Sequence, residues 1–197
     1  MALSKIQSES MNLADTYAFT GTVSGTGSNI KEQLVMLCDG NDYTVSSGTY
    51  TSASVTAAQT PTATYADVTG SSISYTPPSG TTMVLYEFIF SYAFKDANAI
   101  GHFKFFIDSD EVTYGRQTLG TNSNPQWLQS MRFAIPIGGS ADTTTGRQAT
   151  WTTAKTLKMQ VRMYGGSNEC RLHESKYWDG VASNQIHMPK LIVTSYG

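Results

Sequence analysis

The chain has 197 residues, of which 14% are charged and 40% are hydrophobic, and its formal net charge at pH 7 is -2. This length suits one sizeable β-domain with an extension, and the shortage of charge, made up by Thr, Ser, Gly and Asn, is typical of a turn-rich all-β protein. The near-neutral balance lacks the basic stripe that nucleic-acid binding requires, and no run reaches the ~18 apolar residues of a membrane span, so we expect no nucleic acid and no membrane insertion.

Residues 1–30 form a first zone that is too polar and irregular to build a core of its own. It lacks the basic start and the continuous apolar run of a secretion signal, so we expect a protein made in the cytoplasm. We interpret this zone as an arm that attaches the chain to a partner, with packing on its own domain as the alternative. The apolar positions expected to dock the arm are Leu3, Ile6, Leu13, Tyr17 and Phe19.

Residues 31–64 form a second zone of short strands and connector. Gln33–Cys38 is an apolar strand candidate, and the Asp-Gly-Asn-Asp sequence that follows at 39–42 is typical of a turn. The Ser/Thr/Ala-rich tract from Thr44 to Thr64 predicts short edge strands, with a flexible linker as the alternative.

Residues 65–197 form the third zone, which we predict to be the main domain. Its longest pattern begins at Met83–Phe94, where aromatic and β-branched residues alternate with the period of a strand, and it continues at Ile100–Ile107 after a polar turn. We predict that these two segments form the central hairpin of the domain. Leu85 and Ile89 make the first segment apolar on its second face as well.

Further strand candidates show the same alternation, and turn signals separate them. They are residues 68–75, 111–114, 127–137, 157–163, 170–176 and 188–196. No segment has the i, i+3, i+4, i+7 apolar pattern of a helix. The number of strands and the long connections between them predict an all-β fold, a two-sheet antiparallel jelly-roll sandwich with an extended N-terminal arm.

The last strand is apolar on both faces, because Leu191 and Val193 alternate with Ile192. A strand of this kind favours cover on both sides, and an exposed aromatic face would promote aggregation. We therefore predict a closed homotrimer. The residues expected in the core or the trimer interface are Tyr86, Phe88, Phe90, Leu191, Ile192 and Val193.

Residues with catalytic or metal-binding chemistry are present but do not form a known arrangement. The three histidines lack the spacing of a zinc site, and His173-Glu174-Ser175 is not accompanied by a Gly-x-Ser-x-Gly turn. We expect a solvated turn at Asp108–Glu111, where a calcium loop is the alternative, and an ordinary turn at 39–42. The sequence thus predicts no enzyme, no catalytic residue, no metal and no cofactor.

Two smaller features have alternatives that the sequence leaves open. Cys38 and Cys170 allow one disulfide, but we expect two buried free thiols. The aromatic side chains of Trp151, Tyr177 and Trp178 suit the stacking of a sugar or the lining of a recognition groove, and packing inside the domain is the alternative.

The order of elements from Tyr65 to Gly197 resembles the trimeric jelly rolls of the tumour-necrosis-factor and complement-head type. The shared features are an entry strand bounded by Pro and Gly, the long aromatic hairpin, a mid-chain strand, a Lys/Met alternating strand and a short apolar closing strand. In such folds the closing strand lies in the sheet that faces the trimer axis. Separately, Leu13-Ala-Asp-Thr-Tyr-Ala-Phe-Thr-Gly-Thr-Val-Ser-Gly resembles a segment near the N-termini of tail-fibre and other virion proteins of marine bacteriophages.

Together these resemblances imply a non-enzymatic structural protein of a bacteriophage virion, made in the host cytoplasm. It would be a homotrimeric fibre, spike or capsid decoration that binds other virion proteins (capsid, portal, adaptor or tail) through its N-terminal arm. The alternative is a recognition module on the host-facing tip of a tail fibre, with a host surface glycan or receptor as its partner.

Overall fold

The computed structural model describes residues 29–94, 99–120, 126–165, 169–178 and 182–197, and these form strands and connections without a helix. In chain order the strands are β1 (Ile30–Leu37), β2 (Asp42–Val45), β3 (Gly48–Thr51), β4 (Ala66–Asp67), β5 (Ile73–Tyr75), β6 (Met83–Phe94), β7 (Ile100–Ile107), β8 (Asp110–Gly120), β9 (Gln126–Pro136), β10 (Lys155–Met163), β11 (Cys170–Leu172), β12 (Glu174–Trp178), β13 (Ala182–Ile186) and β14 (Lys190–Tyr196). The prediction of an all-β fold is confirmed for this part of the chain.

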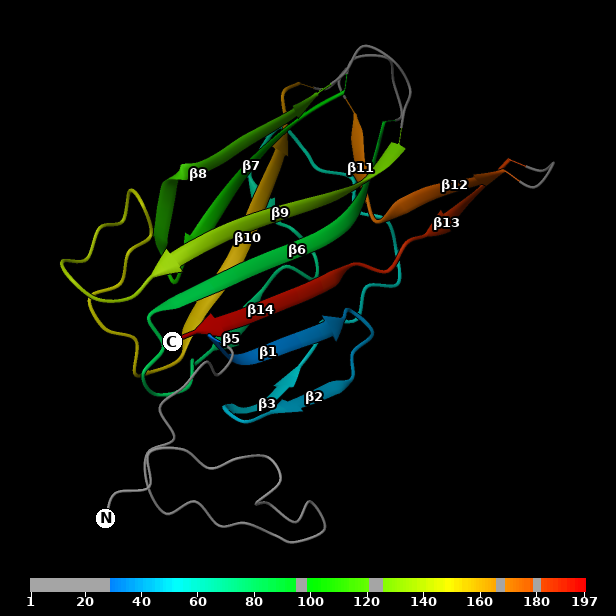
Figure 1. Cartoon of the computed structure of the whole chain (residues 1–197). Helices are drawn as coiled ribbons and strands as arrows, with labels where there is room; N and C mark the ends of the chain where they lie inside the picture. Colours follow the sequence, from blue (N-terminus) through cyan, green and yellow to red (C-terminus); the bar gives the residue numbers. More distant parts are fainter. Residues whose placement is uncertain (1–28, 95–98, 121–125, 166–168, 179–181) are drawn as a thin grey trace, which may run out of the picture.

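Two antiparallel sheets make up the body of the molecule and pack face to face (Figure 1). The first sheet has the strand order β1-β14-β6-β9, and β11 pairs with the far end of β6. The second sheet has β10 and β7 at its centre, with β8 at one edge and both β4 and β5 at the other. Two separate ribbons, β2–β3 and β12–β13, extend from this body.

The two long aromatic segments are strands, but they do not form the predicted hairpin. β6 belongs to the first sheet and β7 to the second, so they share no ladder. Instead their aromatic faces meet across the core, with ring centroids 5.0 Å apart for Tyr86 and Phe105 and 5.7 Å apart for Phe90 and Phe103. The alternating pattern identified the buried face of each strand correctly, but it contains no information on whether two such faces lie side by side or opposite each other.

Aromatic side chains from both sheets fill the core. Phe105 of the second sheet stacks on Phe133 of the first, with centroids 4.2 Å apart and an interplanar angle of 4°. Each fully buried ring removes about 150–250 Å² from water, worth up to roughly 4–6 kcal/mol before conformational entropy is subtracted. Of the six residues predicted for the core or the trimer interface, five are fully buried in the single chain: Tyr86, Phe88, Phe90, Leu191 and Val193. Ile192 is half-buried.

Residues 31–64 are part of the same body and not a connector to a separate domain. β1 forms the edge of the first sheet beside β14, and Leu34, Met36 and Val55 belong to the common core. The predicted boundary at Tyr65 is therefore not seen in the described residues. Within the tract that was predicted to form short strands, β2 and β3 form a hairpin.

A buried carboxylate ties this hairpin to both sheets. Glu32 of β1 accepts hydrogen bonds from Ser46 Oγ (2.5 Å), from Ser47 N and Oγ (2.7 and 2.6 Å) and from Tyr75 Oη (2.8 Å). The Tyr75 hydroxyl also lies 2.8 Å from Ser195 Oγ of β14. Burial alone would raise the pKa of the Glu32 carboxyl, but these hydrogen bonds hold it below its ordinary value.

Both cysteines are free and buried, as predicted. Cys38 Sγ lies 3.5 Å from the carbonyl oxygen of Gly70, and burial raises the pKa of its thiol to about 12. Burial also raises the pKa of the Cys170 thiol. Neither thiol is therefore ionised near neutral pH, and both behave as small core side chains.

Candidate functional site

The outward side chains of the first sheet line up in rows across its strands. One row joins Val35 of β1, Ile192 of β14, Glu87 of β6 and Arg132 of β9. Alternate residues of these strands fill the core, so the residues between them point outward. We call the apolar members of this outward set the outer apolar face: Val35, Leu37, Leu85, Ile89, Leu128, Ala134 and Ile192.

Much of the outer apolar face is open to water in the single chain. Val35, Leu37 and Leu128 on the marginal strands are 48%, 41% and 59% exposed. Ile89 and Ile192 on the central strands are half-buried. Exposure of apolar area to water costs about 25 cal/mol per Å². A complex in which a partner covers this face is therefore stabilised by about that amount for each Å² that is buried.

A single carboxylate lies among these apolar side chains. Glu87 is 8% exposed and accepts hydrogen bonds from Ser130 Oγ (2.6 Å) and Arg132 Nε (2.8 Å). Its charge is thus paired within one chain. A partner can cover this position without leaving an unpaired buried charge, which would otherwise oppose association.

The outer face of the second sheet is mostly polar, although Phe106 is half-buried on it. Glu111 bonds both Lys104 and Arg116, and Asp67 accepts hydrogen bonds from Lys158 Nζ and Gln160 Nε2. The Lys158–Asp67 pair is largely exposed, and the Lys104–Glu111 pair is partly buried. A surface ion pair of this kind contributes only about 0–1 kcal/mol. The outer face of the first sheet thus exposes more large apolar side chains than the outer face of the second, although it also carries Arg132, whose side chain is 65% exposed.

The residues predicted for the trimer interface fall into two groups. Tyr86, Phe88 and Phe90 point into the core of the single chain, together with Leu191 and Val193. Ile192 alone points outward, into the outer apolar face. The alternating pattern placed Ile192 on the opposite face from Leu191 and Val193. It did not predict that Val35 and Leu128 share the outer face with Ile192, because neighbours across strands depend on register.

The other predicted site residues are placed as follows. Trp151 is 6% exposed and donates its indole N–H to the carbonyl oxygen of Tyr75, so it belongs to the core and is not an exposed recognition residue. The backbones of Tyr177 and Trp178 lie in β12, but their side chains lie outside the described residues, as do the five positions predicted for the N-terminal arm: Leu3, Ile6, Leu13, Tyr17 and Phe19.

The acidic residues of the predicted turns are paired with cations and backbone. Asp108, in the turn between β7 and β8, accepts a hydrogen bond from Thr156 N (2.8 Å) and faces Lys155 Nζ (3.3 Å). In the other turn, Asp39 accepts from Asn41 N (3.0 Å). Within the described part of the chain, no three His, Cys, Asp or Glu side chains come close enough together to hold a metal ion.

His173 occupies a strained corner between β11 and β12. Its φ angle is 65°, and its ring is fully buried with its edges toward Phe88 and Phe90. The Thr69 carbonyl lies near the ring but outside hydrogen-bonding geometry, so neither ring nitrogen has a partner among the described residues. Burial lowers the pKa of His173 to about 4. The buried ring has no access to a substrate, so His173-Glu174-Ser175 is not a hydrolytic arrangement.

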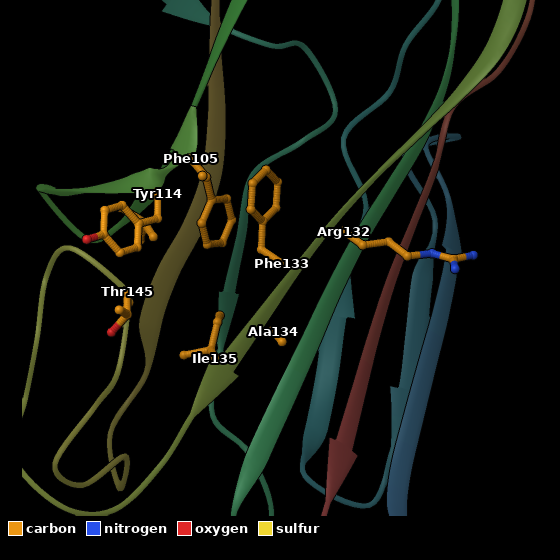
Figure 2. A pocket seen from close by; sticks show the side chains of 10 residues that line it. Phe105, Tyr114, Arg132, Phe133, Ala134, Ile135 and Thr145 are labelled. Atoms are coloured by element: carbon orange, nitrogen blue, oxygen red, sulfur yellow. The ribbon is translucent and has the colours of Figure 1, made fainter. Parts of the chain in front are cut away.

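An open pocket of about 190 Å³ lies at the sandwich edge between β8 and β9 (Figure 2). The stacked rings of Phe105 and Phe133 form one wall, and Tyr114, 80% exposed, stands at the rim. The side chain of Arg132 points away from the pocket, toward the outer apolar face.

No protein-family model matches this chain, and no curated protein matches it. Among the described residues there is also no helix of the length and hydropathy needed to cross a membrane.

Proposed function

We propose that this chain is a non-enzymatic structural subunit of a bacteriophage virion, and that it assembles into a homotrimer through the outer apolar face of its first sheet. The observation that supports the proposal most is the pairing of a water-exposed apolar sheet face with an opposite sheet face that is charged. In a subunit that stays monomeric, the apolar face would remain exposed to water and would promote aggregation.

The topology supports a jelly-roll subunit. Successive long strands alternate between the sheets: β1 is in the first, β5 in the second, β6 in the first, and β7 and β8 in the second, followed by β9, β10 and β14. In a jelly roll a folded-over ribbon of eight strands winds in this way, and the closing strand lies inside the sheet that carries the first. Here β14 lies between β1 and β6, in the sheet that carries the first strand.

The face approaches the size of one standard interface. Four strands about 4.8 Å apart and roughly 24–41 Å long cover on the order of 600 Å² in projection. A standard protein interface takes about 800 Å² of accessible surface from each partner, and side-chain relief makes accessible area larger than projected area. The face of the first sheet therefore supplies most of what one stable interface requires.

The virion assignment rests on the N-terminal segment Leu13–Gly25 and its resemblance to tail-fibre and other virion proteins. In this proposal the arm binds capsid, portal, adaptor or tail proteins, and the sandwich forms the fibre, spike or decoration. Mass spectrometry of purified virus particles should detect the chain at a stoichiometry divisible by three.

Ile192→Asp in the full chain tests the assembly. We expect wild-type protein to have three times the chain mass in light scattering and Ile192→Asp to be a folded monomer, because a carboxylate would be buried without a partner at the centre of the interface. Val35→Asp, in the same cross-strand row, should act alike. Tyr114→Asp is the matched control, since Tyr114 lies on the other sheet and is 80% exposed. A wild-type monomer or a trimeric Ile192→Asp variant would refute the proposed interface.

A further inference from the structure

Five side chains gather on the outer face of the second sheet, where β10 ends and β7 begins. Arg162 lies opposite His102 in the β10–β7 ladder, and His102 lies opposite Thr118 of β8. His102 Nδ1 is 3.0 Å from Thr118 Oγ1, and the ring of Tyr164 is centred 6.0 Å from the His102 ring. The Arg162 guanidinium lies 5.3 Å from the centre of the Tyr65 ring. We call this group the Arg162 cluster.

Arg162 differs from every other cation on these strands. All residues of β4, β5, β7, β8 and β10 are described, and four of their five cations lie within 3.3 Å of a carboxylate oxygen: Lys104, Arg116, Lys155 and Lys158. Arg162 has no such partner among the described residues. Its guanidinium lies against the Tyr65 ring in a cation–π contact, and its buried Nε has no hydrogen-bond partner among those residues.

Two neighbouring nitrogen atoms in the cluster lack hydrogen-bond partners. Arg162 Nε and His102 Nε2 are both buried and unpaired among the described residues. When Nδ1 of His102 accepts from the Thr118 hydroxyl, the ring proton lies on Nε2, so both atoms are donors. Buried donors without acceptors are rare in folded proteins, and two on adjacent strands indicate that an acceptor group from outside the described residues belongs here.

The chemistry of that acceptor follows from the donors and from Tyr164. A guanidinium presents its N–H groups as a planar fork that matches a carboxylate with two parallel hydrogen bonds. Tyr164 is 63% exposed beside this fork and offers an open aromatic face. A sugar ring has an apolar face that packs on such a surface, while its hydroxyl groups reach polar side chains at the edge. An acidic sugar combines both requirements.

The cluster lies at the end of the sandwich that is remote from the chain ends of the described structure. Gly197 N bonds the carbonyl oxygen of Asn29 (2.9 Å), so the chain enters and leaves at one end (Figure 1). β10 starts at that end, beside Tyr75 of β5, and runs to the opposite end, where Met163 pairs with Gly101. A subunit attached near residue 29 would therefore present the Arg162 cluster away from its attachment.

We propose that the Arg162 cluster binds the carboxylate of an acidic sugar of the uronic acid class, with Arg162 and His102 as donors and Tyr164 as the surface that packs on the sugar ring. Binding by one chain does not depend on the trimer or on the virion assignment. It adds a recognition function on the polar face to the assembly function of the apolar face.

The test is a titration of the full chain with glucuronate, glucose and acetate, followed by NMR of the His102 and Tyr164 ring signals. We expect saturable shifts of both rings with glucuronate, binding at least about tenfold weaker for acetate, which lacks the ring, and no saturation with glucose, which lacks the charge. Equal affinity for glucose and glucuronate, or no saturation by glucuronate, would overturn the proposal. Equal affinity for acetate would overturn its sugar component.

Three variants separate binding from folding. Arg162→Lys keeps the charge but not the fork, and should weaken glucuronate binding roughly tenfold or more. Tyr164→Ala changes a mostly exposed side chain, so the fold should persist while the affinity for glucuronate falls to that for acetate. Lys158→Gln is the matched control, because Lys158 is a cation of the same strand already paired with Asp67. If Lys158→Gln weakens binding as much as Arg162→Lys does, general positive charge and not the cluster is responsible, and the proposal fails.

Discussion

Mild acid should destabilise the fold through His173. The ring is fully buried, lies against Phe88 and Phe90 and has no hydrogen-bond partner among the described residues. Burial lowers its pKa to about 4 from an ordinary value of 6.5; the nearby Thr69 carbonyl acts against this shift, and the neighbouring His187 adds to it. The His173 ring therefore binds a proton more weakly in the folded chain than in the unfolded chain.

The size of the effect follows from these two pKa values. Between pH 6.5 and pH 4 the unfolded state binds more protons at this position than the folded state, so stability is lost as the pH falls through that window. Integration gives a loss of about 2 kcal/mol by pH 5 and about 3 kcal/mol by pH 4, relative to neutral pH. This is a large fraction of the 5–15 kcal/mol that is typical of a folded domain.

Urea unfolding at pH 7, 6 and 5 measures this loss when wild type is compared with His173→Asn. Asparagine does not titrate and tolerates a φ angle of 65° better than most residues. His102 also has a pKa lowered by burial and by Arg162, but it titrates in both proteins and cancels in the comparison. We expect wild type to lose about 2 kcal/mol more than the variant between pH 7 and pH 5. Parallel pH dependences in the two proteins would refute the reasoning.

Two further substitutions probe the core and its buried carboxylate. Phe105→Ala removes a ring stacked 4.2 Å from Phe133 and should cost about 3–5 kcal/mol in chemical denaturation; a loss below about 1 kcal/mol would show that the ring is not a core side chain. Glu32→Gln places an amide N–H₂ among the donors from Ser46, Ser47 and Tyr75 and should cost about 1.5–3 kcal/mol at pH 7. Because hydrogen bonds hold the pKa of Glu32 below 4.5, this difference should shrink only as the pH falls below that value; a difference that stays constant down to pH 3 would contradict it.

The strands were predictable because one face of each is buried in a single core. Alternation located β6, β7, β9, β10 and β14 to within a few residues, since a period of two is imposed wherever a strand separates core from solvent. β13 was missed, because its sequence Ala-Ser-Asn-Gln-Ile lacks that alternation. β13 pairs with β12 through backbone hydrogen bonds, and this pairing requires no alternating pattern of side chains.

The candidate sites were far less predictable, because they depend on register and on partners distant in the chain. The sequence placed Ile192 on the opposite face of the last strand from Leu191 and Val193, but its neighbour Val35 lies 157 positions earlier and is brought beside it only by the β1–β14 ladder. Arg162 and His102 were unremarkable in sequence and became a cluster only through the β10–β7 register.

By itself, the sequence determined that this protein is all-β and which residues of its alternating strands fill the core, because these properties depend on composition and on a local period of two. Only the tertiary structure decided that the aromatic strands face each other instead of pairing and that β1 completes the first sheet. It likewise decided that one outer face is apolar and the other charged. Those features depend on which strands pair with each other. Strands pair through backbone hydrogen bonds, and because nearly every residue type can form these bonds, the sequence does not specify which strands become neighbours.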